Sequence, residues 1–220
     1  MAFFDWFTGE RPVLVQRTLE DIVDMVDRGK TMFLSATGVL LDNEILDVDL
    51  EEMDQSINHR EQHCRSTALE YISTSPGNQL IHVLKLLSIV QEAERIGDIA
   101  KSLGALADMA DSPRHGALVA PLRDVRGRIL DFFDMTLQAF RNDDVARAEE
   151  VLRNHQAVKD DVYAYLGRLS RETSITVNEA VVHALAARML GRTSSHLANI
   201  ASTVVFPFER IRRTHPSDDQ

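Results

Sequence analysis

The residues most able to do chemistry in this chain lie in the run Glu94-Arg95-Ile96-Gly97-Asp98. The surrounding apolar residues recur at helical spacing, which places Glu94 and Asp98 one turn apart on the same face of a helix. Carboxylates beside an apolar stripe are costly to bury unless a cation or a hydrogen-bond network neutralises them. Helical bundles build oxygen-rich metal sites from such pairs on facing helices, so the pair favours a cation site. A solvated acidic face is the other interpretation.

The same run, followed by Ala100 and Ser102, resembles the Glu-Arg-Ile-Gly-Asp-x-Ala-x-Asn motif of the PhoU family of phosphate-signalling regulators. Five consecutive matching residues in a helix are far more specific than the spacing of two carboxylates. The resemblance runs from about residue 12 to about residue 212 and is strong in only a few windows. It implies two three-helix bundles, each able to carry a multinuclear iron or zinc cluster on its surface.

In the first half, the resemblance implies ligands from two helices. The run from Asp54 to Glu61 is similar to the family's Asp-x-x-Val-Asp-x-x-Glu motif, with Asn58 in place of an acid, and these three residues share one helical face. Their oxygen donors suit magnesium, calcium, manganese or iron, and the family adds zinc. Without a metal we expect the groups to be exposed, because like charges resist burial. The implied metal ligands are Asp54, Asn58, Glu61, Glu94 and Asp98.

In the second half, the corresponding positions depart from the family pattern. His155 and Lys159 stand where the family has two acids, and Gly191 and Ser195 replace the Glu and the Asp of the third helix. A lysine at a ligand position repels a cation. We therefore expect a divalent or ferric ion in the first bundle only.

The composition is that of an ordinary globular chain. With 220 residues, 44% hydrophobic and 26% charged, it can form one large domain or two small ones, each with a core. The net charge of −10 argues against a nucleic-acid binder. Neither a transmembrane run nor a signal peptide is evident, and the single Cys64 excludes an internal disulfide, so we expect a cytoplasmic protein. Cys64 is expected to be a packed side chain.

Helical periodicity runs through almost the whole chain, with proline and glycine at the breaks. It predicts an all-α fold of six helices in two tandem antiparallel three-helix bundles. The order long, medium, long occurs twice, and the run from Ala93 aligns with the run from Leu190, which indicates an internal repeat. The predicted helices lie at about residues 12–41, 47–73, 79–109, 116–141, 144–171 and 177–212.

The predicted domains are a first bundle at residues 12–111 and a second at 112–213, between two tails. Residues 1–11 are rich in aromatic side chains and are interpreted as a cover for a bundle end or as an anchor to a membrane or partner. Residues 214–220 are polar and expected to be disordered. In the second bundle, we expect Tyr163, Tyr165 and Leu169 to pack against apolar faces that include Phe133, Leu137, Val181 and Leu185.

The resemblance implies a non-enzymatic regulator. It would act as a cytoplasmic adaptor at the inner membrane face, between a membrane phosphate transporter and a sensor kinase. Peripheral membrane association and a homodimer stay open. No nucleophile with a positioned base, phosphate loop or cofactor fingerprint is found in the sequence. The alternatives are a metal-dependent phosphoester hydrolase using a metal-bound water, a divergent helical adaptor for another transporter, and a purely structural scaffold.

Overall fold

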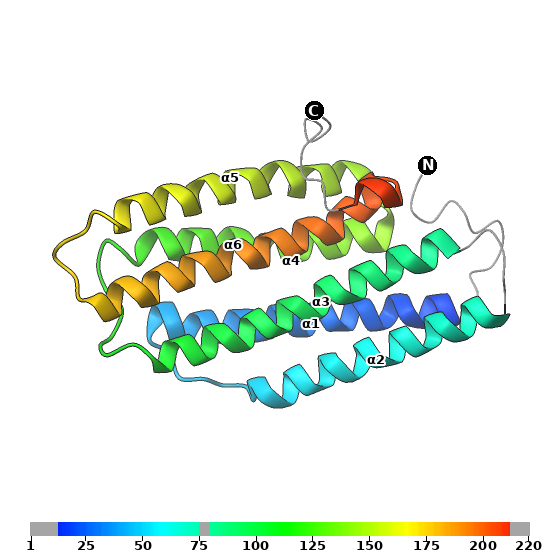
Figure 1. Ribbon diagram of the computed structural model, residues 1–220, viewed down its shortest axis with the longest axis horizontal. Helices are drawn as coiled ribbons and strands as arrows, with labels where there is room; N and C mark the ends of the chain where they lie inside the picture. The colour runs from blue at the N-terminus through cyan, green and yellow to red at the C-terminus, as the bar shows by residue number, and fades with distance from the viewer. Residues whose placement is uncertain (1–12, 75–79, 212–220) are drawn as a thin grey trace.

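The computed structural model describes residues 13–74 and 80–211, and every regular element in these ranges is helical (Figure 1). The predicted aromatic N-terminal tail and polar C-terminal tail lie outside them. The elements are α1 (Val13–Asp42), α2 (Leu50–Thr74), α3 (Leu80–Asp108), α4 (Ala120–Asn142), α5 (Val145–Leu169), α6 (Val177–Val205) and a 3-10 turn at Phe208–Arg210.

The six helices form two three-helix bundles that lie side by side along the long axis of the molecule (Figure 1). Helices α1, α2 and α3 pack together, as do α4, α5 and α6, and the two sets meet where α3 contacts α6 and α1 contacts α4. This confirms the predicted all-α fold of two tandem bundles. The seam is apolar in part, since the rings of Phe33 in α1 and Phe133 in α4 lie 5.6 Å apart and both are fully buried.

A polar network also joins the bundles. Glu92 of α3 is buried, and its Oε2 lies 2.7 Å from Nδ1 of His196 and accepts a hydrogen bond of 2.9 Å from the amide of Asn199, both on α6. Toward the end of α6, Lys85 of α3 donates to the carbonyl oxygens of Thr203 and Phe206. These bonds satisfy polar groups that would otherwise be costly inside the seam.

Two predicted helix ends were wrong, and prolines explain both. The sixth helix was expected to reach residue 212 but ends at Val205, because Pro207 holds Phe206 in an extended conformation with φ −109° and ψ 151°. The fourth helix begins at Ala120 rather than near 116, with Pro121 in its first turn. Gly116 has a φ of +85°, a left-handed conformation that keeps this residue out of α4.

The predicted packing of the second bundle was right in part. Tyr165 and Leu169 are buried, as are Phe133 and Leu137. The prediction was wrong for three other residues, because the buried face lies one residue earlier in α5, at Val162, and one residue later in α6, at Val182 and Ala186. The exposed residues are Tyr163 at 61%, Val181 at 43% and Leu185 at 39%.

Candidate metal centre

The acidic positions of the first bundle lie where α2 and α3 approach each other closely. Gly97 allows this approach, because a Cβ at that position would lie 2.9 Å from Cδ1 of the fully buried Ile57 and 3.7 Å from Oδ1 of Asp54. The glycine of the sequence motif therefore serves interhelical packing. It brings the acidic face of α2 against the acidic face of α3.

Asp54 is only 2% exposed and the other four groups are partly buried, so the expectation that all five would be exposed was wrong, most clearly for Asp54. The reason is Lys101, whose Nζ donates to Asp54 Oδ2 at 2.5 Å, and this hydrogen bond raises the pKa of Lys101. The amide of Asn58 lies 3.4 Å from the same oxygen. A lysine thus supplies the positive charge that a buried carboxylate needs.

Sequence reasoning did not pair Lys101 with Asp54, although the spacing of Lys101 placed it near Glu94 and Asp98. It follows Glu94 by seven residues and Asp98 by three, and therefore lies on the same face of α3. The pairing itself depends on the distance between α2 and α3, which the sequence does not give.

The other three positions form a second group. The pKa of Glu94 is raised to about 7 by burial and then by the neighbouring carboxylates of Asp98 and Glu61, and the nearby Arg95 opposes this only in part. Glu61 has a partner in Arg65, whose Nη2 lies 2.6 Å from its Oε1. Glu94 is therefore only partly ionised near neutral pH, and a bound cation would favour its charged form, whose oxygens are the donors that hard cations prefer.

The structure thus divides the five predicted ligands into two groups. Asp54 accepts hydrogen bonds from Lys101 and Asn58, while the carboxylates of Asp98 and Glu61 act electrostatically on Glu94. Among residues 13–74 and 80–211, no three His, Cys, Asp or Glu side chains converge as a group that could hold a metal ion. The metal site stays a prediction, with the Glu61 group as the part whose chemistry fits.

The equivalent positions of the second bundle carry no carboxylate. His155 of α5 is buried, and its Nδ1 lies 2.8 Å from Oγ of Ser194 in α6, at the positions that correspond to Asp54 and Gly97. Burial, and secondly Lys159, lowers the pKa of His155 to about 4. Where the first bundle brings Glu61 near Glu94, the second has Val162 and Gly191, with 3.6 Å between the valine methyls and a Cβ built on the glycine.

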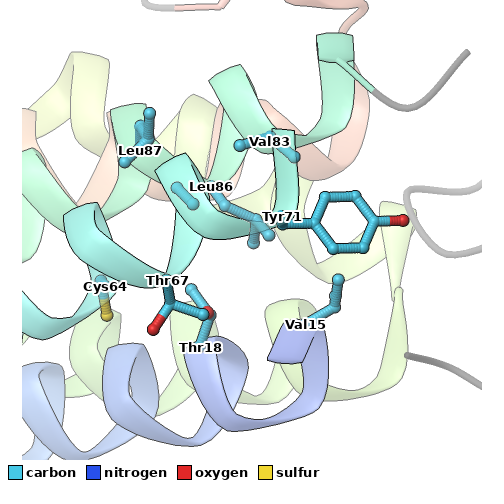
Figure 2. A pocket seen from close by; sticks show the side chains of 9 residues that line it. Val15, Thr18, Cys64, Thr67, Tyr71, Val83, Leu86 and Leu87 are labelled. Carbon is cyan, nitrogen blue, oxygen red and sulfur yellow. The ribbon is translucent and has the colours of Figure 1, made fainter. Parts of the chain in front are cut away.

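A pocket between α1, α2 and α3 offers little room for a substrate. Figure 2 shows its mainly apolar lining, with the ring of Tyr71 at one side and its hydroxyl directed away from the other labelled residues. The cavity measures about 10 Å³, the space of roughly one water molecule. Cys64, which lines it, is buried as predicted, and burial together with Asp21 raises the pKa of its thiol to about 12. Such a thiol is no nucleophile at neutral pH.

The fold and the site together define a class of tandem-bundle helical proteins whose charged motif lies on an interhelical face. The PhoU domain model matches residues 17–107 and 122–204, one segment in each bundle, and the chain belongs to the PhoU family. These segments fall inside the predicted domains, whose boundaries stay predictions. Within the described ranges, none of the helices has the length and apolar character needed to cross a bilayer.

One relative of this family resembles the chain in sequence, and two solved structures resemble it in fold. The chain is 26% identical over 160 residues to a phosphate-specific transport system accessory protein PhoU homolog of Synechocystis, covering 71% of this chain and 70% of the relative. The crystal structure of PhoU from Pseudomonas aeruginosa matches with a TM-score of 0.79 at 21% identity, over 87% of this chain and 95% of that one. The phosphate transport system regulatory protein PhoU from Streptococcus pneumoniae matches with a TM-score of 0.68 at 14% identity, over 87% and 91%.

Proposed function

We propose that the protein regulates phosphate transport and phosphate-responsive signalling, as a cytoplasmic adaptor between a membrane phosphate transporter and a sensor kinase. The observation that carries this proposal is the match of the PhoU domain model to both bundles. The Synechocystis relative, named as an accessory protein of a phosphate-specific transport system, supports it. An adaptor works through surfaces rather than an enclosed pocket, and the described charged motif lies on such a surface.

We further propose that the first bundle holds a divalent or ferric cation through Glu61, Glu94 and Asp98, whose side chains would have to move toward one another, since they do not converge on one point in the structure. When bound, the cation would supply the positive charge that these carboxylates lack. The side chains themselves position the oxygen donors, because Glu61 is held by Arg65 and Gly97 keeps α2 close to α3. The second bundle, with Lys159, Gly191 and Ser195, provides no equivalent set.

Deletion of the gene in its host tests the adaptor role. In phosphate-replete medium, the deletion strain should show altered uptake of radiolabelled phosphate and raised expression of a phosphate-starvation reporter, and the intact gene should restore both. Unchanged uptake and reporter expression would overturn the proposal. A changed uptake of another solute, with normal phosphate uptake, would instead favour the divergent adaptor.

A direct assay separates the adaptor from the hydrolase. Protein loaded with manganese or iron is incubated with p-nitrophenyl phosphate, and the Asp98→Ala variant serves as the control. The adaptor proposal expects the same background rate from both proteins. A turnover that is lost in the variant would establish the hydrolase instead.

A further inference from the structure

The second bundle contains a cleft of its own, away from the acidic face of the first. It lies between the beginning of α4 and the end of α5 and encloses about 330 Å³. Leu122 and Val125 of α4 and Val162 of α5 give it an apolar lining. A volume of this size falls within the range of small-molecule pockets.

The cleft contains a buried hydroxyl without a partner. Tyr165 lines the cleft and is 3% exposed, yet its phenol oxygen has no hydrogen-bond partner among the described residues. Burial raises the pKa of Tyr165 to about 12, so the phenol keeps its proton and can donate. Buried hydroxyls are nearly always bonded, and this exception suggests a group that the protein chain does not supply.

Two guanidinium groups border the same cleft, together with the carboxylates of Asp124 and Asp161, both of which pair with one of these arginines, Arg128. Arg128 is held through Nη2 by Asp161 at 2.6 Å and by Asp124 at 3.2 Å, while its Nε is buried without a partner in the described part of the chain. Arg168 is exposed at the rim and forms no ion pair with any described residue, and its positive charge acts on the Tyr165 phenol. Tyr165 and the two arginines can all donate hydrogen bonds here, so one acceptor group would satisfy them together.

We propose that this cleft binds a small organic oxyanion, a compact apolar molecule with one carboxylate or phosphate-ester group. The head group would accept hydrogen bonds from Tyr165 and Arg168, while its body would cover the apolar lining. The volume and the lining favour an organic molecule over inorganic phosphate, whose oxygens all need polar partners. This site goes beyond the adaptor role and does not depend on it.

Titration of the full-length protein with benzoate, phenyl phosphate and inorganic phosphate tests the site. A chelator is included so that metal in the first bundle does not capture phosphate, and binding is followed by amide chemical shifts of α4 and α5. Both organic anions should bind saturably, and inorganic phosphate about tenfold more weakly or not at all. Arg168→Gln should weaken binding of the organic anions about tenfold, as expected for a hydrogen bond to a charged group.

Two variants make the result decisive. Arg171→Gln removes the same charge from an exposed residue of the following turn that is not part of the cleft lining, and should change affinity less than about twofold. Tyr165→Phe should weaken binding while leaving the thermal midpoint of the free protein equal or higher, because the phenol has no partner to lose.

Four results would overturn the proposal. They are no saturable binding of either organic anion, equal binding of inorganic phosphate, equal losses in Arg168→Gln and Arg171→Gln, and a lowered thermal midpoint in Tyr165→Phe.

Discussion

Asp54 shows how a single contact decides whether a carboxylate can be buried. Its side chain is almost fully covered by α2 and α3, and Lys101 and Asn58 provide its hydrogen bonds. A buried carboxylate without a partner is strongly destabilising, whereas a paired one is tolerated. The conformation of this part of the α2–α3 interface therefore depends on one lysine.

Replacing Lys101 by Met should lower the free energy of unfolding by about 2–4 kcal/mol, because Asp54 keeps its charge but loses its counterion. Chemical denaturation measures the change. The double variant Lys101→Met with Asp54→Asn should recover at least half of the loss, since no buried charge is left. A single variant as stable as the parent protein would show that the pair is not needed for burial.

The second prediction at this scale concerns metal binding by the carboxylates around Glu94. Asp98→Ala should remove most of the bound metal from the purified protein, because it deletes one of the carboxylates that surround Glu94. Ser195→Ala should leave the metal content unchanged, since Ser195 Oγ already donates to the carbonyl of Gly191. Elemental analysis of the three proteins decides this. Equal metal loss in both variants contradicts the assignment, and a parent protein without metal leaves only an acidic face.

His155 should make stability depend on pH. Its pKa is about 4 in the folded protein against about 6.5 in the unfolded chain, so the unfolded state binds more protons between these values. Its contribution is complete above pH 6.5 and is lost as the pH falls toward 4, by up to about 3 kcal/mol. Denaturation curves at several pH values should show a smaller acid loss for His155→Gln than for the parent protein. Parallel pH profiles would refute the effect.

At the level of single residues, the sequence predicted which side chains share one face of a helix. The spacing of Glu94 and Asp98, and that of Asp54, Asn58 and Glu61, correctly placed each set on one face. Contacts between helices could not be predicted, because they depend on interhelical distances that only the packing fixes. The hydrogen bond from Lys101 on α3 to Asp54 on α2 is one such contact.

Among the helices, α2 and α3 approach each other closely at two glycines of α3, Gly97 against Ile57 and Gly104 against Leu50. A Cβ on Gly97 would press against Ile57, which is fully buried. Gly127 of α4 is also inside a helix, but it is exposed and nothing lies within 4 Å of a Cβ built there. Substituting alanine at Gly97 changes both interhelical packing and helix propensity, whereas the same substitution at Gly127 changes helix propensity alone.

Gly97→Ala should lower the free energy of unfolding by about 1 kcal/mol, because the strain of the added methyl exceeds the gain in helix propensity. Gly127→Ala should raise it by about 0.5–1 kcal/mol, since only the propensity changes. Thermal or chemical unfolding of both variants gives the values. Stabilisation by both substitutions would mean that the helices can separate without cost at Gly97.

The sequence predicted all six helices and their order, because amphipathic periodicity over more than 20 residues is a strong pattern. It was weaker at the ends. The residues after Val205 continue the amphipathic pattern of α6, which led to the overlong prediction. Pro207 nevertheless ends the helix, because it disfavours a helical conformation at Phe206. The sides of α5 and α6 that turn outward, with Tyr163 and Val181, depended on how the helices rotate against each other.

In the whole molecule, α3 and α6 are the central pair that joins the two bundles. The carboxylate of Glu92 is buried and accepts hydrogen bonds from the side chains of His196 and Asn199 on α6. Charge-assisted bonds in a covered site are stronger than those in water. The seam between the bundles is therefore part of the folded core.

Glu92→Ala should lower the free energy of unfolding by about 2 kcal/mol and speed amide hydrogen exchange in α3 and α6 together, because donors on α6 lose their acceptor on α3. Hydrogen exchange with mass spectrometry measures both helices in one experiment. Glu149→Ala, at an exposed position of α5, is the control and should change neither quantity by much. Faster exchange confined to α3 would show that the bundles are not coupled through this network.

The seam has a mechanical consequence. Because α3 and α6 run beside each other along the molecule, and their bonds reach from Glu92 to Lys85, the two bundles cannot swing apart like the arms of a hinge without exposing apolar surface and breaking these contacts. These contacts therefore favour movement of the two bundles as one rigid body over hinge motion between them.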